Sequence, residues 1–199
     1  MTKETTNQRT LSIKVMVSTA MLIAICVIMF STPIGTIRLP LISVTIAHIP
    51  VLIATLLFGF KSGLIVGTAF GLTSMIVALT MAVSPFDLLF VNPLISVFPR
   101  VLIPITTYFS YHLIKKFTKN SAGTAIAVSA SALIGNLTNT FAVYIMIYLL
   151  YAQHLLEVTG VSAFNLIITA ISTTTLIKSV IIVLITTPVV MTLKKVLNT

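Results

Sequence analysis

The chain has 199 residues, a mean hydropathy of +1.15 and only 8% charged residues, whereas a soluble domain carries roughly a quarter. These values exclude an ordinary soluble domain and predict one small polytopic membrane domain over residues 1–199. The formal net charge of +9 does not indicate nucleic-acid binding, because the basic residues lie mostly at the ends of apolar segments. The single cysteine, Cys26, excludes an internal disulfide and a cysteine-based metal site, and we expect it to be a packing residue.

Apolar segments in chain order predict an all-α integral membrane bundle of six transmembrane helices, at about 20 apolar residues per span. A polar tail over residues 1–10 precedes a first helix over 11–30 and a loop over 32–46, with an extended piece at 39–46. A short second helix over 47–58, a tight turn at 59–63 and a third helix over 64–81 follow. The last three helices are expected over 94–117, 122–151 and 164–196, separated by a turn at 118–123 and a loop over 152–163.

The basic residues give this bundle an orientation. By the positive-inside rule, the side of a membrane protein that is rich in lysine and arginine faces the cytoplasm. Nine of the twelve basic residues share one side: Lys3, Arg9, Lys14, Lys61, Lys115, Lys116, Lys119, Lys194 and Lys195. Both termini are therefore expected in the cytoplasm, with the loops over 32–46, 82–93 and 152–163 outside.

Three polar residues are expected deep in the membrane at a common level. Arg100, Lys178 and Asn136 lie 15 to 17 positions from the lysines at the cytoplasmic ends of their helices. At a rise of 1.5 Å per residue, each lies roughly 22–26 Å from the cytoplasmic edge of a hydrocarbon core about 30 Å thick. One such residue is explained by snorkelling to an interface, but three at one level predict a pocket open to the outside.

The fifth predicted helix carries a polar and aromatic stripe. Asn136, Thr140 and Tyr144 share one helix face, and Asn139 flanks it. Buried amides either hydrogen-bond a neighbouring helix or contact a ligand, and the residues alone leave both interpretations open. Asn92, just before the fourth helix, either contacts ligand at the outer mouth or caps that helix.

Enzyme motifs are missing from the sequence. There is no Walker A loop, HExxH, CxxC or GxSxG pattern, and the only acidic residues are Glu4, Asp87 and Glu157, expected in the tail and the outer loops. This argues against a metal-dependent enzyme and, unless Asp87 folds inward, against proton-driven transport. We expect no metal and no cofactor, and the two buried cations favour an anionic ligand.

Three stretches resemble the substrate-binding (S) components of energy-coupling factor (ECF) vitamin transporters. The segment "AHIPVLIATLLFGFKSGLIVGTAFGLTSMI", residues 47–76, resembles their second and third helices. The segments "VFPRVLIP", residues 97–104, and "GNLTNTFAVYIMIY", residues 135–148, resemble the pantothenate-type branch. The similarity extends over most of the chain, from the first helix to the sixth.

The resemblance implies a high-affinity vitamin-binding subunit of an ECF-type ABC importer in a bacterial cell membrane. Pantothenate is the favoured vitamin, and pyridoxine or hydroxymethylpyrimidine is the alternative. Such subunits assemble with a membrane scaffold subunit and two ATPase subunits, so ATP is used by the partners and the chain itself is not an enzyme. Ala20 and Ala24 match the family's Ala-x-x-x-Ala motif for the scaffold, with packing inside the bundle as the alternative. The loop over 32–46 is similar to the family's lid over the vitamin.

The candidate vitamins make different demands on the site residues. The carboxylate of pantothenate suits Arg100 or Lys178, and its hydroxyls and amide suit Asn136, Asn139 and Tyr144. A neutral pyrimidine or pyridine vitamin would stack instead on rings from the set Phe86, Phe90, Phe98 and Tyr144. A different class, an autonomous secondary transporter or channel, would transport without any partner.

Overall fold

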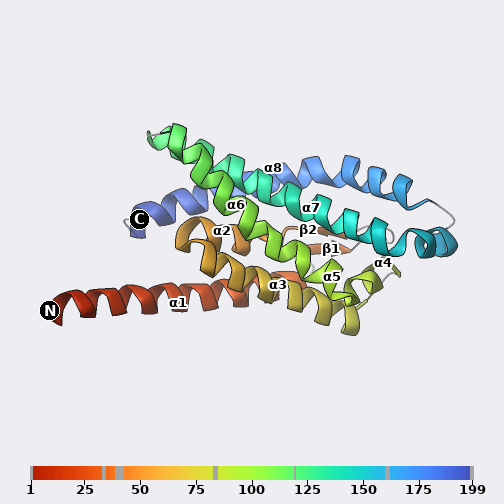
Figure 1. Ribbon diagram of the computed structural model, residues 1–199, viewed down its shortest axis with the longest axis horizontal. Coiled ribbons are helices and arrows are strands. Elements are labelled where there is room, and N and C mark those ends of the chain that lie inside the picture. The colour runs from red at the N-terminus through yellow and green to blue at the C-terminus, as the bar shows by residue number, and fades with distance from the viewer. Residues whose placement is uncertain are drawn as a thin grey trace.

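The structure, a computed structural model, describes residues 2–32, 35–38, 43–82, 85–118, 120–159 and 162–197. Most of these residues are helical, and the long helices run along the longest axis of the molecule (Figure 1). The elements in chain order are α1 Thr2–Ser31, β1 Thr36–Arg38, β2 Ser43–Thr45, α2 Ile49–Phe58, α3 Phe60–Thr80, α4 Pro85–Leu88, the 3-10 helix η1 Leu89–Val91, α5 Pro93–Ser96, α6 Phe98–Phe117, α7 Ser121–Thr159 and α8 Ala163–Leu197.

Five helical segments of the described chain are long and apolar enough to cross a membrane. They are Ile13–Ser31, Phe60–Thr80, Pro93–Phe117, Ser121–Gln153 and Thr175–Leu197. The expected second helix, α2, is not among them and has only 10 residues. At 1.5 Å per residue it covers about 15 Å, half of a typical hydrocarbon core.

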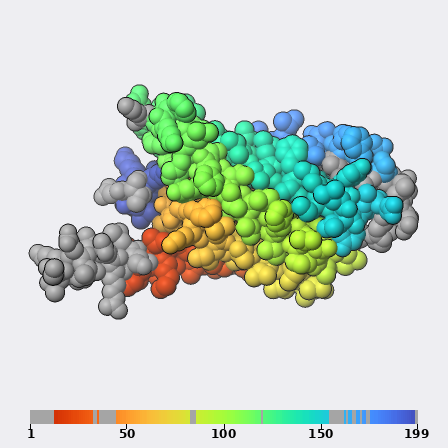
Figure 2. Space-filling model, in the orientation of Figure 1, coloured from red at the N-terminus to blue at the C-terminus, as the bar shows by residue number. Residues whose placement is uncertain are grey.

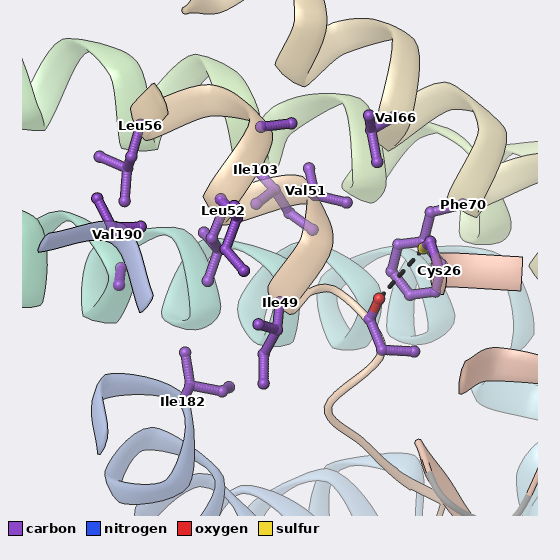
Figure 3. Close-up of a cluster of buried hydrophobic side chains, with 14 of the residues drawn as sticks. Cys26, Ile49, Val51, Leu52, Leu56, Val66, Phe70, Ile103, Ile182 and Val190 are labelled. Atoms are coloured by element: carbon purple, nitrogen blue, oxygen red, sulfur yellow. Dashed lines mark hydrogen bonds between the residues drawn. The ribbon is translucent and has the colours of Figure 1, made fainter. Parts of the chain in front are cut away.

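The short helix α2 forms the centre of the bundle. Eight of its ten residues are buried, and it packs against α1, α3, α6 and α8. Leu52 of α2 lies in a cluster with Ile103 and Val190, which come from α6 and α8 (Figure 3). Cys26 is fully buried in the same cluster and donates to the Ala47 carbonyl at 3.2 Å, which confirms it as a packing residue (Figure 3).

Helix α1 lies along one edge of the molecule, beside α3 (Figure 2). Its outward surface carries large exposed apolar side chains, among them Met16, Met21 and Ile28. Ala20 and Ala24 are also exposed. The alternative in which these alanines pack inside the bundle is therefore wrong, and their role in docking stays a prediction.

A two-stranded antiparallel hairpin precedes α2. Thr36 of β1 pairs with Thr45 of β2, and Arg38 pairs with Ser43. The strand β2 lies within the extended piece expected at 39–46, of which residues 39–42 lie outside the described residues. The hairpin lies against the bundle, where β1 contacts α1 and β2 contacts α8. Pairing of the two strands gives their backbone N–H and C=O groups hydrogen-bond partners at this position.

Several predicted boundaries are wrong, for local reasons. The segment 59–63 is not a turn, because α3 begins at Phe60 and only Gly59 separates it from α2. Gly59 has a φ of 87°, a backbone conformation that suits glycine. The loop over 152–163 is largely helical, since α7 continues to Thr159 after a break at Tyr151. The loop over 82–93 contains α4 and η1, and the fourth helix is interrupted at Val97, between α5 and α6.

Close packing of α3 on α6 fixes the start of α6. A Cβ atom built at Gly67 of α3 would lie 2.7 Å from the Arg100 carbonyl oxygen. That carbonyl lacks its usual helical donor, because Pro104 four residues later has no N–H. Gly71, one turn along α3, lies as close to the Val97 backbone. The glycines let the two backbones approach closely and hold Arg100 at the junction.

Candidate ligand-binding site

A small cavity of about 40 Å³ lies where six elements meet. Polar, aromatic and cationic side chains line it, and none of the described residues in its lining is acidic. They are Thr45 of β2, Phe86 of α4, Phe90 of η1, Arg100 of α6, Asn139, Thr140, Val143 and Tyr144 of α7, and Lys178 of α8. The structure thus brings together four of the six predicted substrate-binding residues.

Arg100 is held rigidly on one side of this cavity. Its side chain is only 2% exposed, in the first turn of α6. Nη1 donates to the Ile95 carbonyl at 2.6 Å, and Nη2 lies 3.5 Å from Ser74 Oγ. The guanidinium carbon lies 5.4 Å and 5.1 Å from the ring centroids of Phe70 and Phe90, within cation–π range. Nε has no hydrogen-bond partner among the described residues, and the two printed contacts use only two of the five N–H donors, so donors remain for a ligand.

Lys178 approaches the same cavity from α8 and is 6% exposed. No described residue forms a hydrogen bond or an ion pair with its ammonium group. An ammonium carries three donors, and burying one without a partner is costly. With no carboxylate among the described lining residues, water or a ligand anion is the compensating group that the cavity can hold.

The two amides of α7 have different surroundings. Asn139 lines the cavity, and its Oδ1 has no partner among the described residues. Asn136 is not a lining residue and donates through Nδ2 to Ser179 Oγ at 2.9 Å, which joins α7 to α8. Asn136 therefore makes the interhelical bond of one interpretation, whereas Asn139 has the position that the ligand-binding interpretation requires.

Comparison with known proteins identifies the family. Residues 14–190 match the family model described as ECF transporter, substrate-specific component. The chain belongs to this family. The pantothenic acid transporter PanT of Lactococcus lactis subsp. cremoris (strain MG1363) is 30% identical over 168 residues, which cover 77% of this chain and 79% of the relative. A solved structure of ThiT from Listeria monocytogenes superposes with a TM-score of 0.62 at 14% identity, covering 90% of this chain and 98% of that one, and shows a shared fold.

Membership of the S components settles the general class of the protein. It is a transporter subunit and not an enzyme, as expected from the missing catalytic motifs. With five helices that can cross a bilayer, it is a multi-pass membrane protein of bacteria. S components bind a vitamin and associate with the subunits of an ECF module.

Both the oxygen and the nitrogen of the Asn92 side-chain amide have a partner within this S component. Its Oδ1 accepts from the Leu94 backbone N–H at 3.0 Å and caps α5, the short helix before α6. Its Nδ2 lies 3.4 Å from Tyr151 Oη. Asn92 does not line the cavity, so the structure gives it the capping position, and its contact with ligand stays a prediction.

Sequence reasoning about this S component missed two features of the cavity. Thr45 lines it from the hairpin, where Thr45 Oγ1 donates to the Gly35 carbonyl at 3.1 Å. The alternation of polar and apolar residues in "SVTI", residues 43–46, was a signal for a strand that presents Thr45 to one side. Asp87, expected in an exposed outer loop, is only 9% exposed because α4 folds it inward. The burial of Asp87 therefore removes the sequence argument against proton-driven transport.

Proposed function

We propose that this S component binds pantothenate, with the carboxylate of the vitamin between Arg100 and Lys178. The observation that carries the proposal is that two buried cations line one cavity, with no acidic residue among the described residues of its lining. A charged hydrogen bond in such a site contributes about 1.5–3 kcal/mol. The 30% identity to a relative named a pantothenic acid transporter supports the same ligand.

The neutral groups of pantothenate find complementary partners in the same lining. Asn139 Oδ1, which has no partner among the described residues, accepts a hydrogen bond from a ligand hydroxyl or amide N–H. Val143 offers an apolar surface beside Tyr144 for the branched carbon skeleton. The site thus combines cations at one group of the ligand with a polar and apolar surface for the remainder.

The present cavity is too small to hold the vitamin. Its volume of about 40 Å³ compares with roughly 300 Å³ or more for typical small-molecule sites. Admission of pantothenate requires movement of the segments that cover the cavity, which are the hairpin with Thr45 and the α4–η1 segment with Phe86 and Phe90. This assigns the lid role to both segments and extends it beyond the loop over 32–46.

Titration calorimetry on the purified S component tests the assignment. We expect pantothenate to bind at least about tenfold more tightly than the corresponding alcohol, which lacks the carboxylate. Mass spectrometry of the ligand retained through purification gives an independent identification. Equal affinities for the acid and the alcohol would contradict the proposal.

A neutral aromatic vitamin is the second candidate, and one observation favours it. Phe86 and Phe90 line the cavity as an edge-to-face pair with ring centroids 5.9 Å apart, and Tyr144 lies in the same lining. Such rings can hold a pyridine or pyrimidine by stacking. Retention of pyridoxine or hydroxymethylpyrimidine, with no binding of pantothenate, would select this candidate.

We further propose that the protein has six membrane helices, namely the five long ones and the short α2, and that both termini are cytoplasmic. The N-terminal end of α1 and the C-terminal end of α8 lie at the same end of the molecule, which supports this arrangement (Figure 1). Asn120 and Ser162 are exposed at opposite ends of α7. Because Cys26 is buried, Ser162→Cys in intact cells should react with an impermeant maleimide, and Asn120→Cys only after permeabilisation. The reverse pattern would overturn the orientation.

The proposed partners are a membrane scaffold subunit, which would dock on α1 at Ala20 and Ala24, and two ATPases that consume the ATP. The buried Asp87 keeps autonomous proton-coupled transport as a competing mechanism. Liposomes containing only the purified chain decide between them. We expect no accumulation of pantothenate under a proton gradient, and accumulation by the chain alone would overturn the dependence on partners.

A further inference from the structure

A second, larger cavity lies at the opposite end of the bundle from the lid segments. Its volume is about 430 Å³, and it lies between the last turns of α6 and α8 and the first turn of α7. Seven described residues line it, of which three are lysines and none is acidic. They are Tyr111 and Lys115 of α6, Ser121 and Thr124 of α7, and Met191, Lys194 and Lys195 of α8.

Two of the three lysines of this cavity are held in place by neutral partners. Lys194 donates to Tyr111 Oη at 2.5 Å, and its ammonium lies 4.2 Å from the centroid of the Tyr111 ring. Lys115 donates to Thr124 Oγ1. Each ammonium has three donors, so both retain N–H groups for another acceptor. All three lysines line one space, and no described residue in its lining carries a carboxylate.

Helix ends alone do not account for this arrangement. Lysines in the last turn of a helix interact favourably with the helix dipole and follow the positive-inside rule. Lys116 satisfies both conditions at the end of α6, yet it is exposed and does not line the cavity. The convergence of Lys115, Lys194 and Lys195 from two helices on one concavity is an additional feature, and it matches the chemistry of a phosphate group.

The helix ends that form the cavity also carry exposed apolar side chains. At the end of α6, Leu113 and Phe117 are 58% and 82% exposed, and at the end of α8, Val196 and Leu197 are 71% and 41% exposed. A soluble anion would gain nothing from such side chains, whereas a phospholipid places its acyl chains beside its phosphate. Basic pockets between helices on the cytoplasmic side of membrane proteins bind the headgroups of anionic lipids.

We propose that this cavity binds the phosphate headgroup of an anionic phospholipid, with Lys115, Lys194 and Lys195 as its ligands. The inference does not rest on the identity of the vitamin. It assigns a lipid site to the end of the S component that lies farthest from the vitamin cavity, where the ends of α6, α7 and α8 meet.

Native mass spectrometry of the delipidated full chain tests this site. Dioleoylphosphatidylglycerol and dioleoylphosphatidylcholine serve as the anionic and zwitterionic probes, and inorganic phosphate serves as the free anion. The electrostatic attraction of a lysine near an anionic membrane corresponds to about fivefold in affinity. We expect the wild-type chain to prefer phosphatidylglycerol, and the triple variant Lys115→Gln, Lys194→Gln, Lys195→Gln to bind both lipids alike.

A matched triple variant controls for net charge. Lys14, Lys61 and Lys116 are exposed and lie outside the cavity, so their joint replacement by Gln removes the same charge and should leave the preference intact. If the first triple variant does not elute as a folded species, Lys195→Gln alone, at an exposed residue, should lower phosphatidylglycerol affinity about fivefold. Loss of the preference in the control variant, or no preference in the wild type, overturns the proposal. Displacement of phosphatidylglycerol by millimolar phosphate would assign the site to a free anion and overturn the lipid assignment.

Discussion

Replacement of Lys178 by Met separates the effect of the buried charge on protein stability from its effect on ligand affinity. Lys178 is 6% exposed and has no hydrogen-bond or ion-pair partner in the described part of the chain. Methionine has a similar length and flexibility but carries no charge. Replacing buried charge by an apolar side chain of similar volume is often neutral or stabilises a protein by about 1–4 kcal/mol. We therefore expect Lys178→Met to leave the ligand-free protein at least as stable as the wild type.

The same substitution should weaken pantothenate binding. Loss of a charged hydrogen bond of about 1.5–3 kcal/mol corresponds to a roughly 10- to 150-fold increase in Kd. The corresponding alcohol, which offers no carboxylate, should lose much less affinity. Opposite signs for stability and for acid binding are the signature of a charge that is retained for its ligand.

Two measurements on the same detergent-solubilised protein check this prediction. Thermal unfolding without ligand should give a melting temperature equal to or higher than that of the wild type, and titration calorimetry should show the loss of affinity for the acid. Lys61→Met, at an exposed lysine at the start of α3, is the control and should change neither value. A clear drop in melting temperature with unchanged pantothenate affinity would refute the reasoning and make Lys178 a structural residue.

Three further predictions concern other parts of the molecule. Asn139→Ala should weaken ligand binding by roughly 1–3 kcal/mol in calorimetry. Asn136→Ala loses an interhelical hydrogen bond of about 0.6 kcal/mol, so it should lower the melting temperature and leave the affinity per folded molecule nearly unchanged. Gly67→Ala places a Cβ 2.7 Å from the Arg100 carbonyl oxygen, so it should reduce both thermal stability and affinity; wild-type values for both would contradict the close packing. Ala20→Trp or Ala24→Trp should abolish scaffold copurification and cellular uptake while the isolated subunit still binds ligand, and normal uptake would remove α1 from the docking surface.

The shared level of Arg100 and Lys178 in the bundle could be predicted from the sequence, but which side chains face the site could not. Each residue lies on a helix that continues, past one internal proline, to lysines in its last turn, so a constant rise per residue fixes its height above those lysines. The same counting places Asn136 at that height, yet Asn139 lines the cavity and Asn136 bonds to α8. Height along an axis does not fix rotation about it, because rotation depends on how α7 packs against α6 and α8.

The covering segments were harder to predict for a related reason. Short elements such as α4 and η1 have too few residues to show a hydrophobic period. The inward position of Asp87 depends on how α4 lies against the rest of the bundle, and no local pattern encodes that. In contrast, the long helices, the short α2 and the packing role of Cys26 follow from apolar composition alone.

The narrow vitamin cavity has consequences for the rates of ligand exchange. In the proposed binding mode, the cavity of about 40 Å³ admits water but no vitamin, so a ligand meets a competent site only while the hairpin and the α4–η1 segment are apart. The association rate constant is then the encounter rate multiplied by the fraction of time that these segments spend open. Departure needs the same motion, so the residence time of the ligand depends on the opening rate as well as on its contacts. A slowly opening lid would let the subunit capture a scarce nutrient and still hold it when a transport partner arrives.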